Sequence, residues 1–292
     1  MANSIALFKQ YVPVLDEIYK EASKSAVLDG NADLARQGAN ADELIIPKMS
    51  MDGLGDYSRN SGYVDGDVTL TNETVKCNYD RGRMFTVDAL DDIETASIAF
   101  GRLAGEFIRT KVVPELDAFR FSKYAAEAGT KHAATLADGE DVIAELRNAV
   151  NTMDEDEVPA DGRILFITPT LYGMIQDLET IKSREVLSRF SQIVLVPGTR
   201  FYTAISRKDG KTEGQTAGGY TRAENGKQLN FLAIHPSATI QYPKHTVNKV
   251  ISPEANQTSD GWKFGYRTVG IAEVYENKTA GIYSSYDNAS FT

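Results

Sequence analysis

The sequence predicts a mixed α+β protein in which one long helix connects an extended β-hairpin to a helix–strand–helix layer. Apolar residues keep helical spacing from Ile93 to Tyr124. β-rich segments flank a glycine-rich stretch between Glu43 and Asp88. Further along, an amphipathic helix, a short apolar strand and a second helix start follow one another, which is the order of an α/β layer.

The N-terminal segment, residues 1–42, is predicted to form an amphipathic arm. Its apolar residues follow helical spacing, and they are Ile5, Phe8, Val12, Leu15, Ile18 and Ala22. Pro13 is expected to kink or divide this helix. After a turn signal at residues 29–31 the chain is small and polar up to Ala41, as in an extended linker.

Residues 43–90 are predicted to form an extended hairpin loop. Two β-rich segments, LIIPKM and TLTNETVKCNYDRGRMFTV, flank a tip that contains Gly53, Gly55, Gly62 and Gly66. A lone two-stranded ribbon is marginal in water, so it needs another surface to lie against. In an assembly, a neighbouring subunit supplies that surface.

Residues 91–138 are predicted to carry the longest helix, within a peripheral domain. Asp91 or Asp92 can cap a helix that ends near Gly129. Pro114 interrupts it, so we expect a kink or two abutting helices.

Residues 139–250 are predicted to form a compact mixed domain. A capped helix over Asp138–Met153 precedes the strand RILFIT, and Pro169 begins another helix. Short buried strands are expected at Ser191–Pro197 and Asn230–Ile234, with a polar glycine-rich loop between them. Residues 251–292 return to strand-like composition, with a turn near Glu276, and are expected to pair with earlier strands.

Charge and composition exclude several classes of protein. With 31 basic and 41 acidic residues the formal net charge is −10, which repels a phosphate backbone and argues against ordinary DNA binding. No apolar run is long enough to span a membrane, and no secretion signal opens the chain, so we expect a cytoplasmic protein. The single cysteine, Cys77, cannot close an intrachain disulfide.

No catalytic, metal-binding or cofactor-binding site is predicted. The three histidines, His132, His235 and His245, do not have metal-ligand spacing. Gly210-Lys211-Thr212 is similar to the end of a phosphate loop but lacks its first glycine. The acidic run 154–157 lacks the alternating ligands of a calcium loop.

The element order, with KVVPELDAFRFSKYA on the long helix, resembles the major capsid proteins of tailed double-stranded DNA phages, whose fold encapsulin shells share. The resemblance implies an N-terminal arm, an extended loop, a spine helix, and peripheral and axial domains. It implies hexamers and pentamers that close into an icosahedral head, without sequence-specific DNA contacts. The protein would then be part of the virion, assembled in the bacterial cytoplasm.

The resemblance also implies contacts and partners. We predict a separate scaffolding protein, a portal and candidate decoration proteins. Because residues 52–67 contain no lysine, we predict no isopeptide cross-link of the kind that some family members form. The intersubunit contact candidates, in the arm and the loop, are Phe8, Tyr11, Leu15, Leu54, Tyr57, Arg59, Tyr63, Arg81 and Arg83.

Three alternatives stay open at this point. An encapsulin-like shell would enclose a cargo enzyme instead of DNA. A cytoplasmic α/β enzyme would hold a small molecule near Thr168 and Tyr172. A non-capsid phage component would form rings or tubes instead of closed shells.

Overall fold

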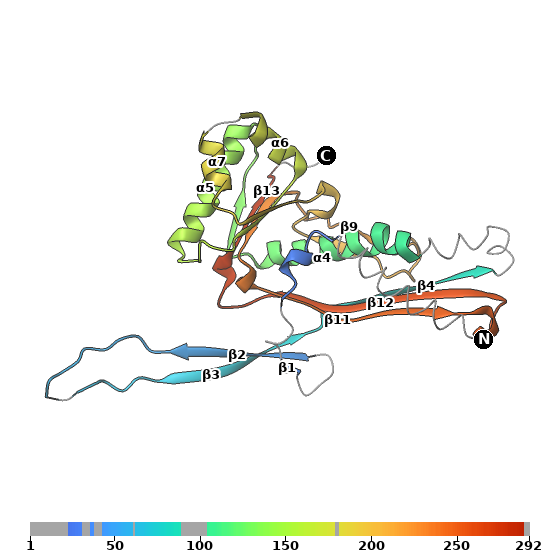
Figure 1. The fold of residues 1–292 in the computed structure, drawn as a ribbon, viewed down its shortest axis with the longest axis horizontal. Coiled ribbons are helices and arrows are strands. Elements are labelled where there is room, and N and C mark those ends of the chain that lie inside the picture. Colours follow the sequence, from blue (N-terminus) through green and yellow to red (C-terminus); the bar gives the residue numbers. More distant parts are fainter. Residues whose placement is uncertain are drawn as a thin grey trace.

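The computed structural model describes residues 23–30, 36–37, 43–60, 62–88, 104–178 and 181–288. It is a mixed α+β fold, as predicted (Figure 1). An α/β layer lies over one long helix, a three-stranded sheet lies beneath that helix, and a hairpin extends away from the body.

The α/β layer is built on a five-stranded sheet with the order β5-β13-β10-β6-β7. Its strands are β5 (Thr130–Ala133), β13 (Ile282–Tyr286), β10 (Leu229–Ile234), β6 (Ile164–Ile167) and β7 (Gln192–Leu195). One face packs on three helices, namely α5 (Gly139–Glu155), α6 (Pro169–Leu178) and α7 (Ile181–Leu187). The predicted cap of α5 is confirmed, since the Asp138 carboxylate accepts the N–H of Asp141 at 3.0 Å.

The core of this layer follows from the alternation of side chains along its strands. Leu165, Ile167 and Phe231 point to the three helices, whereas Phe166 and Leu232 point to the opposite face, where they meet the long helix. Both faces are therefore covered, which explains why β6 and β10 are apolar throughout.

The long helix, α4 (Val113–Glu127), follows a π-helical segment at Ile108–Val112. Pro114 has no backbone N–H and its ring crowds the carbonyl of Thr110 in a regular helix. The wider π turn just before it gives that ring room, so the helical path continues through Pro114 instead of breaking. The predicted helix over residues 91–103 lies outside the described residues.

The three-stranded sheet has the order β11-β12-β4, with β11 at Thr239–Ile251, β12 at Gly261–Val274 and β4 at Tyr79–Asp88. Phe264 and Tyr266 of β12 pack against Ile108, Val112 and Val113 of the helical segment. All three strands are antiparallel to their neighbours.

The hairpin consists of β2 (Glu43–Met51) and β3 (Val68–Lys76), and residues 52–67 form its tip. The predicted range of the hairpin loop, residues 43–90, also includes β4, which leaves the hairpin and pairs with β12. Asn78 marks the break: its side chain donates to the carbonyl of Ala272 at 2.7 Å and accepts the N–H of Ala272 at 3.2 Å. That side chain turns the chain from one sheet into the other.

Two other predicted ranges combine strands of different sheets. The predicted compact domain, residues 139–250, includes most of β11, which belongs to the three-stranded sheet. In the C-terminal range, β12 pairs with β4 and β11, whereas β13 pairs with β10 and β5 of the α/β layer. Smaller elements complete the chain: Ala26–Leu28, β1 (Arg36–Gln37), Gly198–Arg200, β8 (Ile205–Arg207), β9 (Tyr220–Arg222), Pro236–Ala238, Pro253–Ala255 and Thr279–Gly281.

Candidate assembly surfaces

One face of the hairpin presents an exposed apolar row. Met49 pairs with Leu70 and Met51 with Val68, and cross-strand partners share a face of the ribbon. Their exposed fractions lie between 59% and 67%. The other face carries Ser50, Thr69 and Thr71 at the alternating register positions. The apolar row therefore has no partner among the described residues of its own chain.

The tip continues this exposed apolar surface. Leu54, Tyr57, Tyr63 and Val64 are all exposed. Tyr57 and Tyr63 contact each other with ring centroids 5.0 Å apart. A small turn orders them, since Ser58 and Gly62 exchange backbone hydrogen bonds of 3.1 and 2.7 Å. Of the twelve exposed large apolar side chains in the described part of the chain, eight lie between residues 49 and 70.

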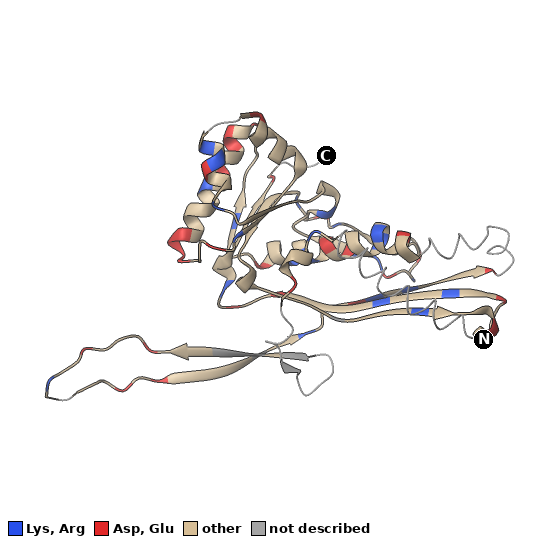
Figure 2. Cartoon of the chain, in the orientation of Figure 1, with Lys and Arg blue, Asp and Glu red and all other residues tan. Residues whose placement is uncertain are grey.

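The tip is also acidic. Residues 52–67 carry Asp52, Asp56, Asp65 and Asp67 against one cation, Arg59, near the end of the hairpin (Figure 2). The Asp52 carboxylate accepts the N–H of Asp67 at 2.9 Å, and the carbonyl of Asp67 accepts the N–H of Asp52 at 3.2 Å. These bonds close the base of the tip.

The root of the hairpin is held by the body. Val75 is buried against Ile240 of β11 and Ile271 of β12. The hairpin is thus anchored to the body at its root and projects from the body at its tip (Figure 1).

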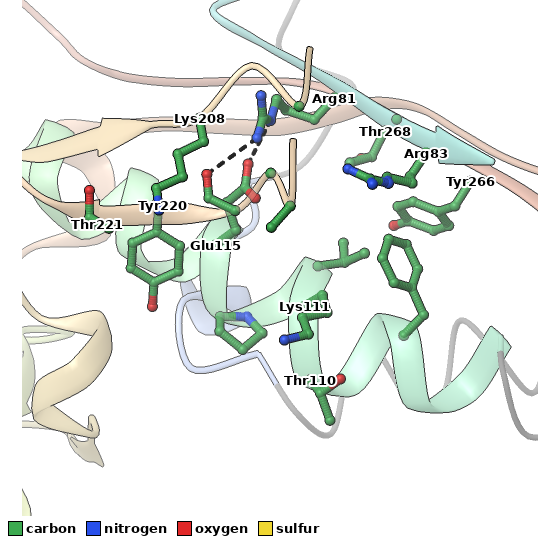
Figure 3. A pocket seen from close by; sticks show the side chains of 18 of the residues that line it. Arg81, Arg83, Thr110, Lys111, Glu115, Lys208, Tyr220, Thr221, Tyr266 and Thr268 are labelled. Atoms are coloured by element: carbon green, nitrogen blue, oxygen red, sulfur yellow. Dashed lines mark hydrogen bonds and ion pairs between the residues drawn. The ribbon is translucent and has the colours of Figure 1, made fainter. Parts of the chain in front are cut away.

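A cavity of about 950 Å³ lies between β4, β12, the helical segment before α4 and the β8–β9 region. Tyr79, Phe85, Phe107, Tyr220 and Tyr266 give it aromatic walls. The cations that line it are Arg81, Arg83, Lys111, Lys208 and Arg222, and the carboxylates are Glu106, Glu115 and Asp209 (Figure 3).

Charges in the cavity do not cancel. Arg81 Nε pairs with Glu115 Oε1 at 2.6 Å, and both Arg83 terminal nitrogens donate to the Thr216 carbonyl at 3.1 Å. Among the residues that the structure describes, Lys111 and Lys208 have no ion-pair partner. Burial raises the pKa of Tyr220 to about 12, so its hydroxyl keeps its proton at physiological pH. The cavity is therefore aromatic and cationic.

The structure separates the predicted contact residues into three groups. Leu54, Tyr57, Arg59 and Tyr63 lie exposed on the tip. Arg81 and Arg83 lie on β4 in the cavity instead of on the hairpin, and each already has a partner in its own chain, which corrects their placement. Phe8, Tyr11 and Leu15 lie outside the described residues.

Sequence reasoning missed two features of this surface. The apolar row of Met49, Met51, Val68 and Leu70 was available as an alternating pattern on both strands. Lys111 and Lys208 carried no such signal, since only the fold brings them to one cavity.

The structure shows where the motifs considered in the sequence lie. Asp209 accepts the N–H groups of Lys211 and Thr212 at 2.8 and 2.9 Å, so this turn offers few free donors to a phosphate. Thr168 and Tyr172 lie at the start of α6, where Tyr172 packs on the core.

Within the described ranges, no group of three or more His, Cys, Asp or Glu side chains could hold a metal. No helix in these ranges is long and apolar enough to cross a membrane.

Comparison with solved structures identifies the fold. The mature capsid of bacteriophage PhiM1 aligns with a TM-score of 0.62 at 11% identity, over 87% of this chain and 85% of that one. The capsid of Cyanophage P-SCSP1u aligns with a TM-score of 0.55 at 12% identity, over 87% and 86%. A virus-like particle from Pyrococcus furiosus aligns with a TM-score of 0.57 at 12% identity, over 93% and 95%. No protein-family model and no curated protein sequence matches the chain. The chain therefore has the tailed-phage capsid fold that its sequence predicts.

Proposed function

We propose that this chain is the major capsid protein of a tailed phage, which assembles as hexamers and pentamers into an icosahedral shell around double-stranded DNA. Its role is structural and not catalytic. The observation that carries this proposal is the hairpin, whose large apolar side chains are exposed in the free subunit. Such a surface marks an interaction site.

The hairpin tip of one subunit fits the cavity of another by charge and by chemistry. The tip brings four carboxylates and two tyrosines, and the cavity brings aromatic walls and two lysines that have no ion-pair partner among the described residues. Complementary charges select the partner and its orientation more than they add affinity. Residues of β4, β12 and β9 line the cavity, and the hairpin extends away from these strands (Figure 1), so a second copy supplies the tip.

Removal of the tip tests the function. We expect a chain in which residues 52–67 are replaced by a two-residue turn to keep its circular-dichroism spectrum and its unfolding temperature, because the core does not use the tip. Closed shells should be absent in negative-stain electron micrographs. Normal shells from this variant would remove the main support for the proposal.

Charge reversal tests the cavity as receptor. Lys111→Glu with Lys208→Glu should raise the concentration needed for assembly by roughly 2- to 5-fold for each pair lost, as measured by light scattering. Asp56→Lys with Asp65→Lys in the same chain should restore part of the loss. Lys182→Glu, at an exposed position of α7 and far in sequence from the residues that line the cavity, is the matched control and should leave the assembly concentration unchanged. If the Lys111→Glu, Lys208→Glu variant assembles at the wild-type concentration, the cavity is not the receptor for the tip.

A second candidate is a shell that encloses protein cargo, as in encapsulins. The match to the Pyrococcus particle, which covers 95% of that chain, supports considering it. Particles purified with nuclease-protected DNA would favour the phage head, and particles filled with an enzyme would favour the compartment. The scaffolding, portal and decoration partners predicted above belong to the first candidate only.

A further inference from the structure

The segment of residues 23–30, here called the arm root, is held by a buried polar cluster. It connects the predicted arm to the body, and Leu28 fixes it to the main apolar core. Ser23 and Ser25 are both buried although they are polar. A short irregular segment buries such groups only when they find hydrogen-bond partners.

Asp117 on α4 supplies most of these partners. It is fully buried, and its two oxygens accept five hydrogen bonds. Oδ1 accepts from Ser23 Oγ at 2.8 Å, from Ser25 Oγ at 2.7 Å and from the Ser25 N–H at 3.2 Å. Oδ2 accepts from the Lys24 N–H at 3.0 Å. Three consecutive residues of the arm root thus bind one carboxylate.

Two arginines complete the cluster from different parts of the fold. Arg120 of α4 donates to Ser25 Oγ at 3.0 Å and pairs with Asp29 at 3.4 Å. Arg200, in the turn that follows β7, donates to Asp117 Oδ2 at 3.2 Å. Two carboxylates therefore balance two guanidinium groups, as a buried cluster requires.

β11 holds the other end of the arm root. Gln241 Nε2 donates to the Ser25 carbonyl at 2.7 Å and to Asp29 Oδ1 at 2.6 Å. The Tyr124 hydroxyl of α4 donates to Gln241 Oε1 at 2.7 Å, which fixes the amide. The long helix, the three-stranded sheet and the α/β layer all meet at these eight residues of chain.

We propose that Asp117 is a positioning residue for the N-terminal arm. It fixes Ser23 against α4, and through Arg200 it ties that point to the α/β layer. Every copy then fixes Ser23 at the same place on its body, so intersubunit contacts of the predicted arm would start from one repeated position. This inference rests on the proposed shell function, because only a repeated assembly needs a repeated arm position.

Asp117→Asn tests the inference, since it keeps the shape and removes the charge. Hydrogen–deuterium exchange of the Lys24 and Ser25 amides in the free subunit should become at least about tenfold faster, because both amides lose a charged acceptor. Assembly should give irregular particles instead of one uniform class in electron micrographs. The control is Asp80→Asn, which removes an exposed pair with Arg267 and should leave both readouts unchanged.

Two outcomes overturn the inference. Faster exchange with uniform particles would mean that Asp117 only stabilises the segment, and unchanged exchange would mean that it does not hold the segment. If Asp117→Asn does not fold, Ser23→Ala with Ser25→Ala removes two of the hydroxyl donors but leaves the Asp117 carboxylate paired with Arg200, and it is judged by the same two results. A wild-type chain that forms no particles would count against the proposed function, while exchange in the free subunit still decides what Asp117 holds.

Discussion

Strand β10 and the hairpin strands β2 and β3 are all regular β structure, but they differ in what covers them. All six residues of β10 are buried between α4 and the helices α5 to α7. Within the part of the chain that the structure describes, the hairpin strands pair with each other and with two residues of β1, and their outer apolar row is exposed. The α/β layer therefore gains its stability within one chain, whereas the hairpin leaves its apolar row uncovered in one chain, as the proposed intersubunit contact requires.

The size of this difference can be estimated. Full burial of one large apolar side chain is worth about 1.5–3 kcal/mol. β10 gains that free energy on folding, and the eight exposed apolar side chains of the hairpin do not. A second subunit that covers only some of them gains several such contributions, repeated at every contact in a closed shell.

The largest expected effect comes from the buried strand. Phe231 is fully buried, and its ring stacks on that of Tyr283 with centroids 6.1 Å apart. Phe231→Ala should lower the free energy of unfolding of the unassembled subunit by about 3–5 kcal/mol, because it leaves a cavity. Urea denaturation measures this. A loss below about 1 kcal/mol would mean that the layer is not the stable core described above.

A smaller effect on folding, but a large one on assembly, is expected from the hairpin. Met51→Thr with Val68→Thr replaces one cross-strand apolar pair by residues that keep strand propensity. The free subunit should change in stability by less than about 1 kcal/mol. The yield of shells at a fixed concentration should fall. If urea denaturation instead shows a loss as large as that of Phe231→Ala, the row is packed within its own chain and the comparison fails.

The smallest effect concerns the loop between β8 and β9, which is exposed like the hairpin but ordered by its own hydrogen bonds. The Thr212 hydroxyl, followed by the N–H groups of Lys211 and Thr212, lowers the pKa of Asp209 to about 2. The pKa of Asp209 is lower in the folded loop than in the unfolded chain. The charged carboxylate therefore stabilises the loop fully above about pH 4, and this stabilisation is lost as the pH falls through 2. An NMR titration of the Asp209 carboxyl measures this pKa directly. A value near 4 would show that the turn is not formed in solution.

Local patterns predicted the elements better than their pairing. The capped helix before Met153, the strand at residues 164–167 and the helix after Pro169 were all visible, because capping residues and apolar periodicity are local signals. The residue at which the hairpin ends was not visible in the sequence. β3 and β4 read as one β-rich segment, and the two hydrogen bonds between Asn78 and Ala272 join residues that lie 194 positions apart.

The candidate assembly surfaces also contain parts that local sequence patterns predicted and parts that they did not. Leu54, Tyr57 and Tyr63 could be predicted because large apolar residues beside glycines and aspartates have no core to enter. The cavity could not, because its cations come from β4, from the segment before α4 and from the β8–β9 region. Asp117 shows the limit most clearly: an acidic residue within an apolar helical pattern gives no hint that the arm root will bind it.

The π segment at Ile108–Val112 has a consequence for how this fold tolerates changes in length. A π turn accommodates one more residue than the α-helical turn it replaces. Loss of one residue there would convert the segment to a regular α-helix, because the wide turn holds the extra residue within one turn. Phe107 would keep the position from which its ring contacts that of Phe85, with centroids 4.8 Å apart. A change of one residue in length is therefore absorbed at this place, whereas the same change within α4 would rotate the residues on one side of it by about 100° relative to the other side.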